Sequence, residues 1–188
     1  MSFLEISATL FGLLQGYLVM INKRSNWIAY IVQMVLMFMF SLSVQLYGDA
    51  LNNICYIFVG IVGYIVWNKK DLNDITKCSM KERIVYIVVM IIATFLGMLL
   101  LKKTDDPLPL IDAFTTVSSF IATYYMITKK IDTWAIWFIN DIFYCITYLL
   151  LPTPALYLFA LNLIWAFMAI ASFINWKQIM LKNNERLR

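Results

Sequence analysis

Seven long apolar stretches separated by short polar segments constrain what this chain of 188 residues can fold into. A helix needs about 20 mostly apolar residues to cross a bilayer. Because 62% of the residues are hydrophobic and only 14% are charged, the chain lacks the polar surface that a soluble domain requires. We therefore predict an all-α integral membrane protein with seven transmembrane helices, over residues 6–21, 27–44, 50–67, 84–101, 108–127, 134–151 and 155–176.

The basic residues predict how these helices are oriented, because they resist translocation. With the N-terminus outside, all of the 15 basic residues except Lys102 and Lys103 fall in cytoplasmic segments. We predict a multi-pass protein of the bacterial cytoplasmic membrane, with its N-terminus outside, its C-terminus inside and no cleavable signal peptide. Since this topology accounts for the net positive charge, no nucleic-acid partner is implied.

The residue inventory leaves little scope for catalysis or metal binding. The chain has no histidine, the commonest general base and metal ligand of proteins. Its cysteines, Cys55, Cys78 and Cys145, lack the paired spacing of zinc sites and disulfide frameworks. We therefore expect no enzyme activity, no cofactor and no metal.

The two ends of the chain resemble each other, which predicts an internal repeat. A shift of 107 positions places Trp27 on Trp134 and Gln33 on Asn140. After an apparent two-residue insertion near Pro152, a shift of 109 positions aligns three further pairs, namely Asn53 with Asn162, Tyr56 with Trp165 and Trp67 with Trp176. Tryptophan and amide residues match by chance less often than leucine or isoleucine in membrane helices.

These matches predict a 3+1+3 arrangement within a single membrane domain, residues 1–188. Its parts are a first three-helix repeat (1–68), a charged loop with a linker helix (69–104), and a second three-helix repeat with a cytoplasmic tail (105–188). Both halves then cross the bilayer in the same direction, as a parallel repeat. In transporters of this design the substrate binds near the midplane between the halves, so the arrangement favours a transporter.

Polar side chains deep inside the predicted helices are the candidates for a binding site, since an unpartnered polar group in hydrocarbon costs several kcal/mol. Asp141 lies about seven residues, roughly 10 Å, inside its helix. Its three- and four-residue spacing from tryptophan and tyrosine neighbours predicts a face that stacks on a flat polar ring, with amides to orient it. The candidate substrate-binding residues are Trp134, Trp137, Asn140, Asp141, Asn162, Trp165, Gln33, Asn53 and Tyr56.

Structural roles compete with this interpretation. Tryptophans at helix ends, such as Trp27, Trp67 and Trp176, are typical of an interfacial aromatic belt, and Trp134 fits either role. Amides such as Gln33 and Asn140 can join helices by hydrogen bonds instead of binding substrate.

Several segments of the chain resemble the PnuC family of bacterial vitamin and nucleoside transporters over nearly its whole length. The resemblance rests on Trp134-x2-Trp137-x3-Asp141, on the amide and aromatic pair Asn53-x2-Tyr56, and on three further features. These are the segment Leu46-Tyr47-Gly48-Asp49-Ala50-Leu51 and the helix-ending Trp67 and Trp176.

The resemblance implies a SWEET-like fold, a homotrimer with one substrate path per protomer, and facilitated diffusion. A cytoplasmic kinase would phosphorylate the substrate and so trap it. Nicotinamide riboside is the substrate that the resemblance favours, because its cationic ring suits a face rich in tryptophan that also carries Asp141. Deoxyribonucleosides, thiamine and riboflavin are the alternatives within the family.

Two alternatives come from other functional classes. A membrane receptor or assembly subunit without transport would use the deep polar residues only to join helices. A sugar transporter would have the same fold but little preference for an aromatic ring.

Overall fold

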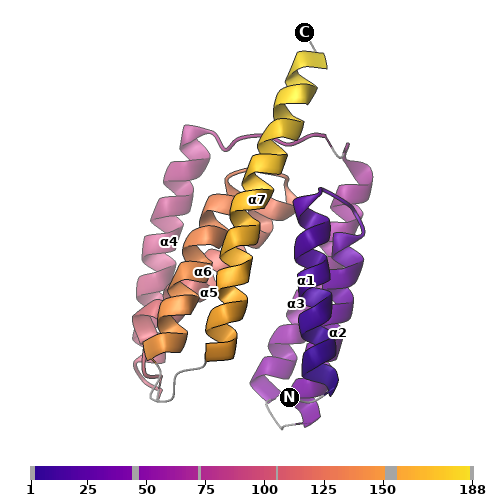
Figure 1. Cartoon of the computed structure of the whole chain (residues 1–188). Coiled ribbons are helices and arrows are strands. Elements are labelled where there is room, and N and C mark those ends of the chain that lie inside the picture. The colour runs from indigo at the N-terminus through magenta and orange to yellow at the C-terminus, as the bar shows by residue number, and fades with distance from the viewer. Residues whose placement is uncertain (1–2, 44–46, 72, 105, 151–155, 187–188) are drawn as a thin grey trace. The chain divides into compact units, whose positions relative to one another are not determined.

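The computed structural model describes residues 3–43, 47–71, 73–104, 106–150 and 156–186, which form seven α-helices (Figure 1). The helices are α1 (Phe3–Met20), α2 (Asn26–Ser43), α3 (Tyr47–Lys69), α4 (Met80–Leu101), α5 (Pro109–Ile127), α6 (Thr133–Leu150) and α7 (Leu156–Arg186). All are long and apolar enough to cross a membrane, which confirms the predicted all-α membrane fold. Leu46 of the family-like segment and the proposed insertion near Pro152 lie outside the described residues.

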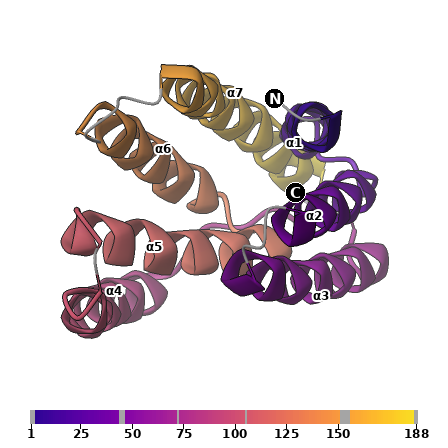
Figure 2. The ribbon, with the colours of Figure 1, turned by 90° about the horizontal axis from the view of Figure 1, so that it is seen from below.

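The helices pack into two compact units. In the first unit, residues 1–74, α2 packs against α1 and against α3. In the second unit, residues 75–186, α6 packs against α5 and α7, and α4 packs against α5 (Figure 2). The linker helix α4 therefore belongs to the second unit by its packing.

Each unit contains an edge-to-face pair of tryptophans. Trp27 of α2 contacts Trp67 of α3 with ring centroids 5.7 Å apart at 84°, and Trp134 of α6 contacts Trp176 of α7 at 5.2 Å and 89°. Trp27, Trp67 and Trp176 have no exposed surface. The prediction of an interfacial belt is wrong for these three residues, because a belt requires rings that face the lipid headgroups. The rings instead contribute to the cores of their units.

The turns that join α1 to α2 and α5 to α6 have the same backbone geometry. Asn22 and Lys129 adopt left-handed conformations, with φ of 57° and 59°. The N–H of Asn22 donates to the carbonyl of Val19, and that of Lys129 donates to the carbonyl of Met126. Such left-handed residues end helices by satisfying their last carbonyl groups. Because both turns align at the shift of 107, they support the predicted repeat.

The N-terminus of α4 is set by a capping box. The Oγ of Ser79 accepts a hydrogen bond from the N–H of Glu82 at 3.2 Å, and the N–H of Ser79 donates to Oε2 of Glu82 at 2.6 Å. These two bonds satisfy N–H groups that a helix end otherwise leaves without partners. The helix consequently begins at Met80, before the apolar stretch that starts at Ile84.

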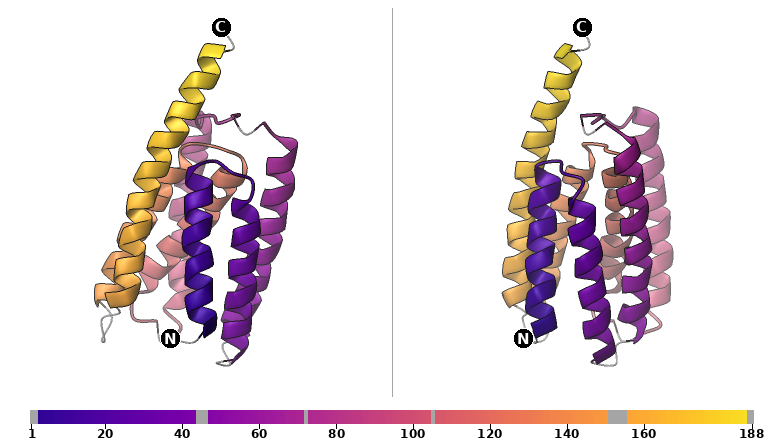
Figure 3. Two further views of the ribbon diagram at one scale, coloured as in Figure 1. Left: turned by 45° about the vertical axis from the view of Figure 1, so that its right-hand side comes forward. Right: turned by 90° about the vertical axis from the view of Figure 1, so that its right-hand side faces the viewer.

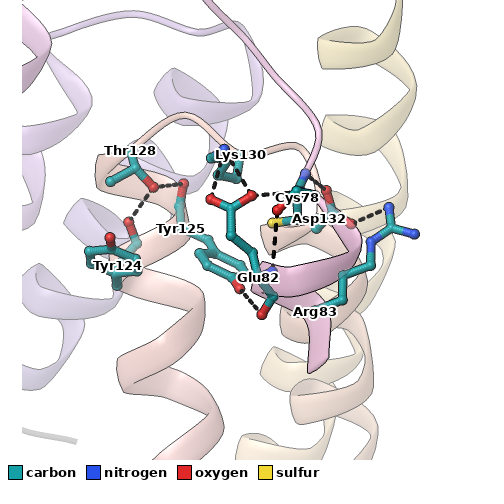
Figure 4. A network of polar contacts seen from close by, with 9 residues as sticks. Cys78, Glu82, Arg83, Tyr124, Tyr125, Thr128, Lys130 and Asp132 are labelled. Atoms are coloured by element: carbon teal, nitrogen blue, oxygen red, sulfur yellow. Dashed lines mark hydrogen bonds and ion pairs between the residues drawn. The ribbon is translucent and has the colours of Figure 1, made fainter. Parts of the chain in front are cut away.

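A polar clamp attaches the start of α4 to the turn between α5 and α6 (Figure 4). Asp132 accepts a hydrogen bond from the N–H of Cys78 at 2.8 Å and forms an ion pair with Arg83 at 2.7 Å. Glu82 forms an ion pair with Lys130 at 3.0 Å. Each ionised side chain thus has a partner of opposite charge on the other side of the clamp.

Backbone hydrogen bonds strengthen the polar clamp. The N–H of Thr76 donates to the carbonyl of Lys129 at 3.1 Å, and the N–H of Ile131 donates to the carbonyl of Thr76 at 2.9 Å. The hydroxyl of Tyr125 also donates to the carbonyl of Glu82 at 3.3 Å. The segment that precedes α4 is therefore fixed to the second unit by main-chain as well as side-chain contacts.

Candidate functional site

A layer of buried polar side chains crosses the second unit. Asn140, Asp141 and Asn162 are 0%, 4% and 4% exposed. Hydroxyl groups of α5 bond Asn140, and the half-buried Tyr144 of α6 lies near Thr115, Ser119 and Asp141. We call this set the polar layer, and its members are Thr115, Ser118, Ser119, Asn140, Asp141, Tyr144 and Asn162.

Asn140 joins α6 to α5. The hydroxyl of Ser118 donates to Oδ1 of Asn140 at 2.6 Å, and Nδ2 of Asn140 donates to Oγ of Ser119 at 3.4 Å. Since both ends of this amide bond the neighbouring helix, the geometry favours the structural role that was weighed for it. Its contact with substrate stays a prediction.

The hydroxyl side chains of α5 were not among the predicted site residues. Thr115, Ser118 and Ser119 are all buried, and the latter two donate to the carbonyl of Thr115 at 3.0 and 2.5 Å. Thr123 similarly donates to the carbonyl of Ser119. Their spacing of three and four residues along an apolar helix was a usable signal, because it places small polar groups on one face.

Asp141 lies in the middle of α6, on a side of this helix that faces between α5 and α7. Asn140 bonds α5, whereas Cys145 donates to the carbonyl of Phe159 in α7 at 3.6 Å. At about 100° per residue, Asp141 points between the α5 and α7 sides of its helix. No hydrogen bond or ion pair joins its carboxylate to any residue that the structure describes.

The predicted tryptophans of the second unit have different environments. Trp134 packs against Trp176, and its Nε1 is buried without a partner among the described residues. Trp137 is half-buried and packs against a cluster formed by Cys78, Ala122, Tyr125 and Ile136. Trp165 is half-buried on α7. The two half-buried rings keep part of their surface available for stacking, whereas Trp134 does not.

Asn162 keeps part of its amide available. Its Nδ2 donates to the carbonyl of Leu158, one turn earlier in α7, at 2.9 Å. Its Oδ1 accepts no hydrogen bond from the residues described in the structure. A buried side chain whose carbonyl oxygen has no donor is suited to accept one from a ligand.

The first unit holds the remaining candidates. The amide Nδ2 of Asn53, which is 8% exposed, donates to Oγ of Ser41 at 3.3 Å across α2 and α3. Gln33 lies against Gly12 of α1, where a Cβ atom would come within 2.7 Å of its Nε2. Tyr56 is half-buried one turn after Asn53. The amide of Gln33 has no hydrogen-bond partner within the described part of the chain.

Within the second unit, the polar layer and the half-buried tryptophans have the chemical groups to bind a small polar molecule and orient it. Amide and hydroxyl groups suit ribose and carboxamide groups, a carboxylate suits a cation, and half-buried tryptophan rings suit stacking. Among the described residues, no group of three histidine, cysteine or acidic side chains is placed to hold a metal ion.

Comparison with known proteins identifies the family. Residues 2–178 match the model of the nicotinamide mononucleotide transporter family. The nicotinamide riboside transporter PnuC of Neisseria mucosa is 22% identical over 197 residues, which cover 97% of this chain and 75% of that protein. The crystal structure of the vitamin B3 transporter PnuC matches with a TM-score of 0.77 at 21% identity, over 96% of this chain and 83% of that one.

These matches confirm the fold and the resemblance that the sequence motifs carry. The structural match concerns the seven-helix fold, and the family match covers all seven helices except the last residues of α7. The chain therefore belongs to the nicotinamide mononucleotide transporter family.

Proposed function

We propose that the chain carries nicotinamide riboside into bacterial cells by facilitated diffusion. The observation that carries this proposal is the polar layer, which combines a carboxylate, a partly unbonded amide and hydroxyl groups inside a helical unit of a transporter family. The Neisseria mucosa relative is named as a nicotinamide riboside transporter, which supports the same substrate. Asp141 and Asn162 from the second unit, and Gln33, Asn53 and Tyr56 from the first, are the proposed substrate-binding residues.

Charge favours the riboside over the phosphorylated mononucleotide that gives the family its name. A phosphate group requires basic side chains or an array of N–H donors. In this chain the apolar spans 3–20, 26–43, 50–67, 84–101, 109–127, 133–150 and 156–176 contain no lysine or arginine. A substrate path without basic residues suits a cation and disfavours a phosphate monoester.

The absence of basic residues from the path also explains how substrate accumulates although the transporter itself uses no energy source. A cytoplasmic kinase that adds a phosphate converts a compound that the path accepts into one that it rejects. Net uptake then continues as long as phosphorylation continues. In this proposal the protein is a homotrimer, with its N-terminus outside and its C-terminus in the cytoplasm.

Calorimetric titration of the purified protein tests the proposal. The ligands are nicotinamide riboside, nicotinamide mononucleotide, thiamine, riboflavin, deoxyadenosine and thymidine. We expect saturable binding of nicotinamide riboside and at least about 100-fold weaker binding of the mononucleotide, which corresponds to roughly 2.7 kcal/mol. The proposed substrate is wrong if the folded protein does not bind nicotinamide riboside or binds another of these ligands more tightly.

A matched pair of asparagines tests the site. Asn53 is buried and Asn52, its neighbour on α3, is exposed. The Asn53→Ala variant should weaken binding of nicotinamide riboside, and the Asn52→Ala variant should bind as the unmodified protein does. If Asn53, Asn162 and Asp141 can each be replaced by alanine without loss of affinity in folded protein, the deep polar residues only join helices, as in a receptor or assembly subunit.

A further inference from the structure

Asp112 and two tyrosines lie at one end of the second unit. Asp112 is in the first turn of α5, and Tyr148 lies two residues before the end of α6. The two helices pack against each other and are joined by the short turn over residues 128–132, so the start of α5 lies beside the end of α6. Asp112 is close enough to both Tyr144 and Tyr148 to interact with them electrostatically.

The two tyrosine rings form a stacked pair. Their centroids are 6.1 Å apart and their planes differ by 15°. Both residues lie on the same face of α6 as Asp141, at three and seven residues from it. Tyr144 lies near Thr115 and Ser119 of the polar layer, and both rings are half-buried. The pair therefore leads from Asp112 to the polar layer and keeps part of its ring surface exposed.

An aromatic pair beside a carboxylate suits a cationic ring. The faces of tyrosine rings carry negative charge density and attract cations, and a carboxylate adds the attraction of a full charge. A pyridinium nitrogen that carries a sugar has no N–H, so hydrogen-bond acceptors cannot bond its charge directly. Aromatic faces and carboxylates can still attract it. The second unit therefore has, at the start of α5, the groups that recognise the charge of such a ring.

The first unit lacks this combination at the positions that the predicted repeat aligns. The shift of 107 gives three pairs, namely Asp112 with Glu5, Tyr144 with Met37 and Tyr148 with Ser41. The helix dipole accounts for an acid at the start of both helices. It does not account for a stacked pair of tyrosines in one of the two units.

An interfacial aromatic belt explains only one of the two tyrosines. Tyr148 is close enough to the end of α6 to lie at the membrane surface. Tyr144 lies one turn deeper, near the buried hydroxyl groups of α5. A role in binding accounts for both rings and for the acid beside them.

We propose that Asp112, Tyr144 and Tyr148 form an entry subsite, which holds the positively charged ring of the substrate before the ring reaches the polar layer. This inference rests on the proposed function and on its orientation, which places the start of α5 outside. The carboxylate attracts the cation, and the stacked rings hold it by contact. Because its occupation is transient, the entry subsite raises the rate of entry without an energy source and leaves the equilibrium affinity of the polar layer nearly unchanged.

Initial rates of uptake test the entry subsite. The measurement is uptake of radiolabelled nicotinamide riboside by spheroplasts in sucrose medium, far below saturation and corrected for the amount of each variant in the membrane. We expect Asp112→Asn to lower the rate about fivefold at an ionic strength of about 0.01 M and less at about 0.15 M, because salt screens an exposed charge. The matched control is Glu5→Gln, which neutralises the aligned acid of the first unit and should change the rate by less than about twofold.

The contribution of the ring pair is tested at Tyr148. Tyr148→Leu removes one aromatic face and should lower the rate of uptake about threefold. Tyr148→Phe keeps the ring and should recover most of that loss. The affinity of the purified protein, measured by calorimetry, should change by less than about twofold in Asp112→Asn and Tyr148→Leu, because steering acts on the rate of entry.

If Tyr148→Leu fails to fold, Asp112→Asn and its control decide the question. The entry subsite is ruled out if folded protein with either Asp112→Asn or Tyr148→Leu takes up nicotinamide riboside as fast as the unmodified protein. It is also ruled out if Glu5→Gln slows uptake as much as Asp112→Asn, since any acid at that end of the helices would then suffice. Both of these results leave the proposed function in place. A folded wild-type protein that neither binds nor transports nicotinamide riboside would overturn both proposals.

Discussion

At the scale of single residues, two amides that the repeat aligns have different surroundings. Both hydrogen-bonding ends of Asn140 bond serines of α5, whereas the amide of Gln33 lies against Gly12 with no hydrogen bond to the described residues. In the predicted repeat, one of these aligned positions therefore joins two helices, and the other has no hydrogen bond to the described residues. This difference separates a structural residue from a candidate binding residue.

We expect alanine at Asn140 to lower stability and alanine at Gln33 to lower affinity. Asn140→Ala should lower the free energy of unfolding by about 1–3 kcal/mol, because it removes two hydrogen bonds between α5 and α6 and truncates a fully buried side chain. Its affinity for nicotinamide riboside should stay within about twofold wherever it is folded. Gln33→Ala should keep its stability and lose about tenfold in affinity, the equivalent of one hydrogen bond. Thermal unfolding in detergent and calorimetric titration measure the two effects. An Asn140→Ala variant that is stable but binds weakly would contradict this division.

A glycine in the first unit gives a second prediction at this scale. A Cβ atom at Gly63 would lie 2.5 Å from the ring of Trp27, which is fully buried. Gly63→Ala should therefore cost about 1–3 kcal/mol of stability by overpacking, despite the better helix propensity of alanine. The matched control is Gly97→Ala, whose Cβ would meet Ala113 at 3.2 Å and should be tolerated better. Equal unfolding temperatures for the two variants would show that the side chains around Trp27 rearrange to accept the added methyl group without loss of stability.

The sequence predicted buried polar residues but not how they are used. Depth alone pointed to Asp141, Asn162 and Asn53, and all three are buried. Depth could not show that Asn140 bonds serines through both its oxygen and its nitrogen, because these partners lie on another helix. Nor could spacing distinguish the tryptophans, since Trp134 is covered by Trp176 and Trp137 keeps an exposed part. Side-chain contacts between helices decide these points, and they depend on packing that hydropathy does not encode.

At the scale of helices, hydropathy located each element and misjudged some ends. The apolar stretches predicted all seven helices, but α7 continues past Trp176 to Arg186 and extends beyond its neighbours in the second unit (Figure 3). Most residues from Lys177 to Arg186 are polar, but several of them favour helices, so the helix continues where the apolar stretch stops. The start of α4 was likewise determined by the Ser79 capping box rather than by hydrophobicity.

The polar clamp at the start of α4 leads to a prediction at the same scale. Asp132→Ala removes both the ion pair with Arg83 and the hydrogen bond to the N–H of Cys78. We expect a loss of about 1–2 kcal/mol, most of it from the hydrogen bond, because the Arg83 side chain is partly exposed and solvent screens its ion pair. Amide hydrogen exchange should increase over residues 75–83.

The control for the clamp is Lys81→Ala, an exposed basic residue on the first turn of α4 that forms no ion pair with the described residues. It should leave exchange over residues 75–83 unchanged. If Asp132→Ala also leaves it unchanged, the main-chain bonds of Thr76 alone hold the segment, and the side-chain part of the clamp contributes nothing measurable.

At the scale of the whole molecule, ring packing and backbone geometry support the predicted repeat. The tryptophan pairs and the left-handed turn residues recur at the aligned positions of both units. Three helices on each side of a linker helix would make the two halves cross the membrane in the same direction. The distribution of basic residues then determines which direction that is.

Cysteine labelling tests the predicted orientation. The starting protein has Cys55, Cys78 and Cys145 replaced by alanine, which removes any background from native thiols. One thiol is then introduced by Lys69→Cys, at the end of α3, or by Lys103→Cys, after α4, since both positions are exposed. With the N-terminus outside, a membrane-impermeant maleimide should label Lys103→Cys in intact spheroplasts. It should label Lys69→Cys only after the membrane is opened, because this orientation places the basic segment before α4 in the cytoplasm. The reverse pattern would place the N-terminus inside, and labelling of both positions in intact spheroplasts would mean that the basic residues do not impose a single topology.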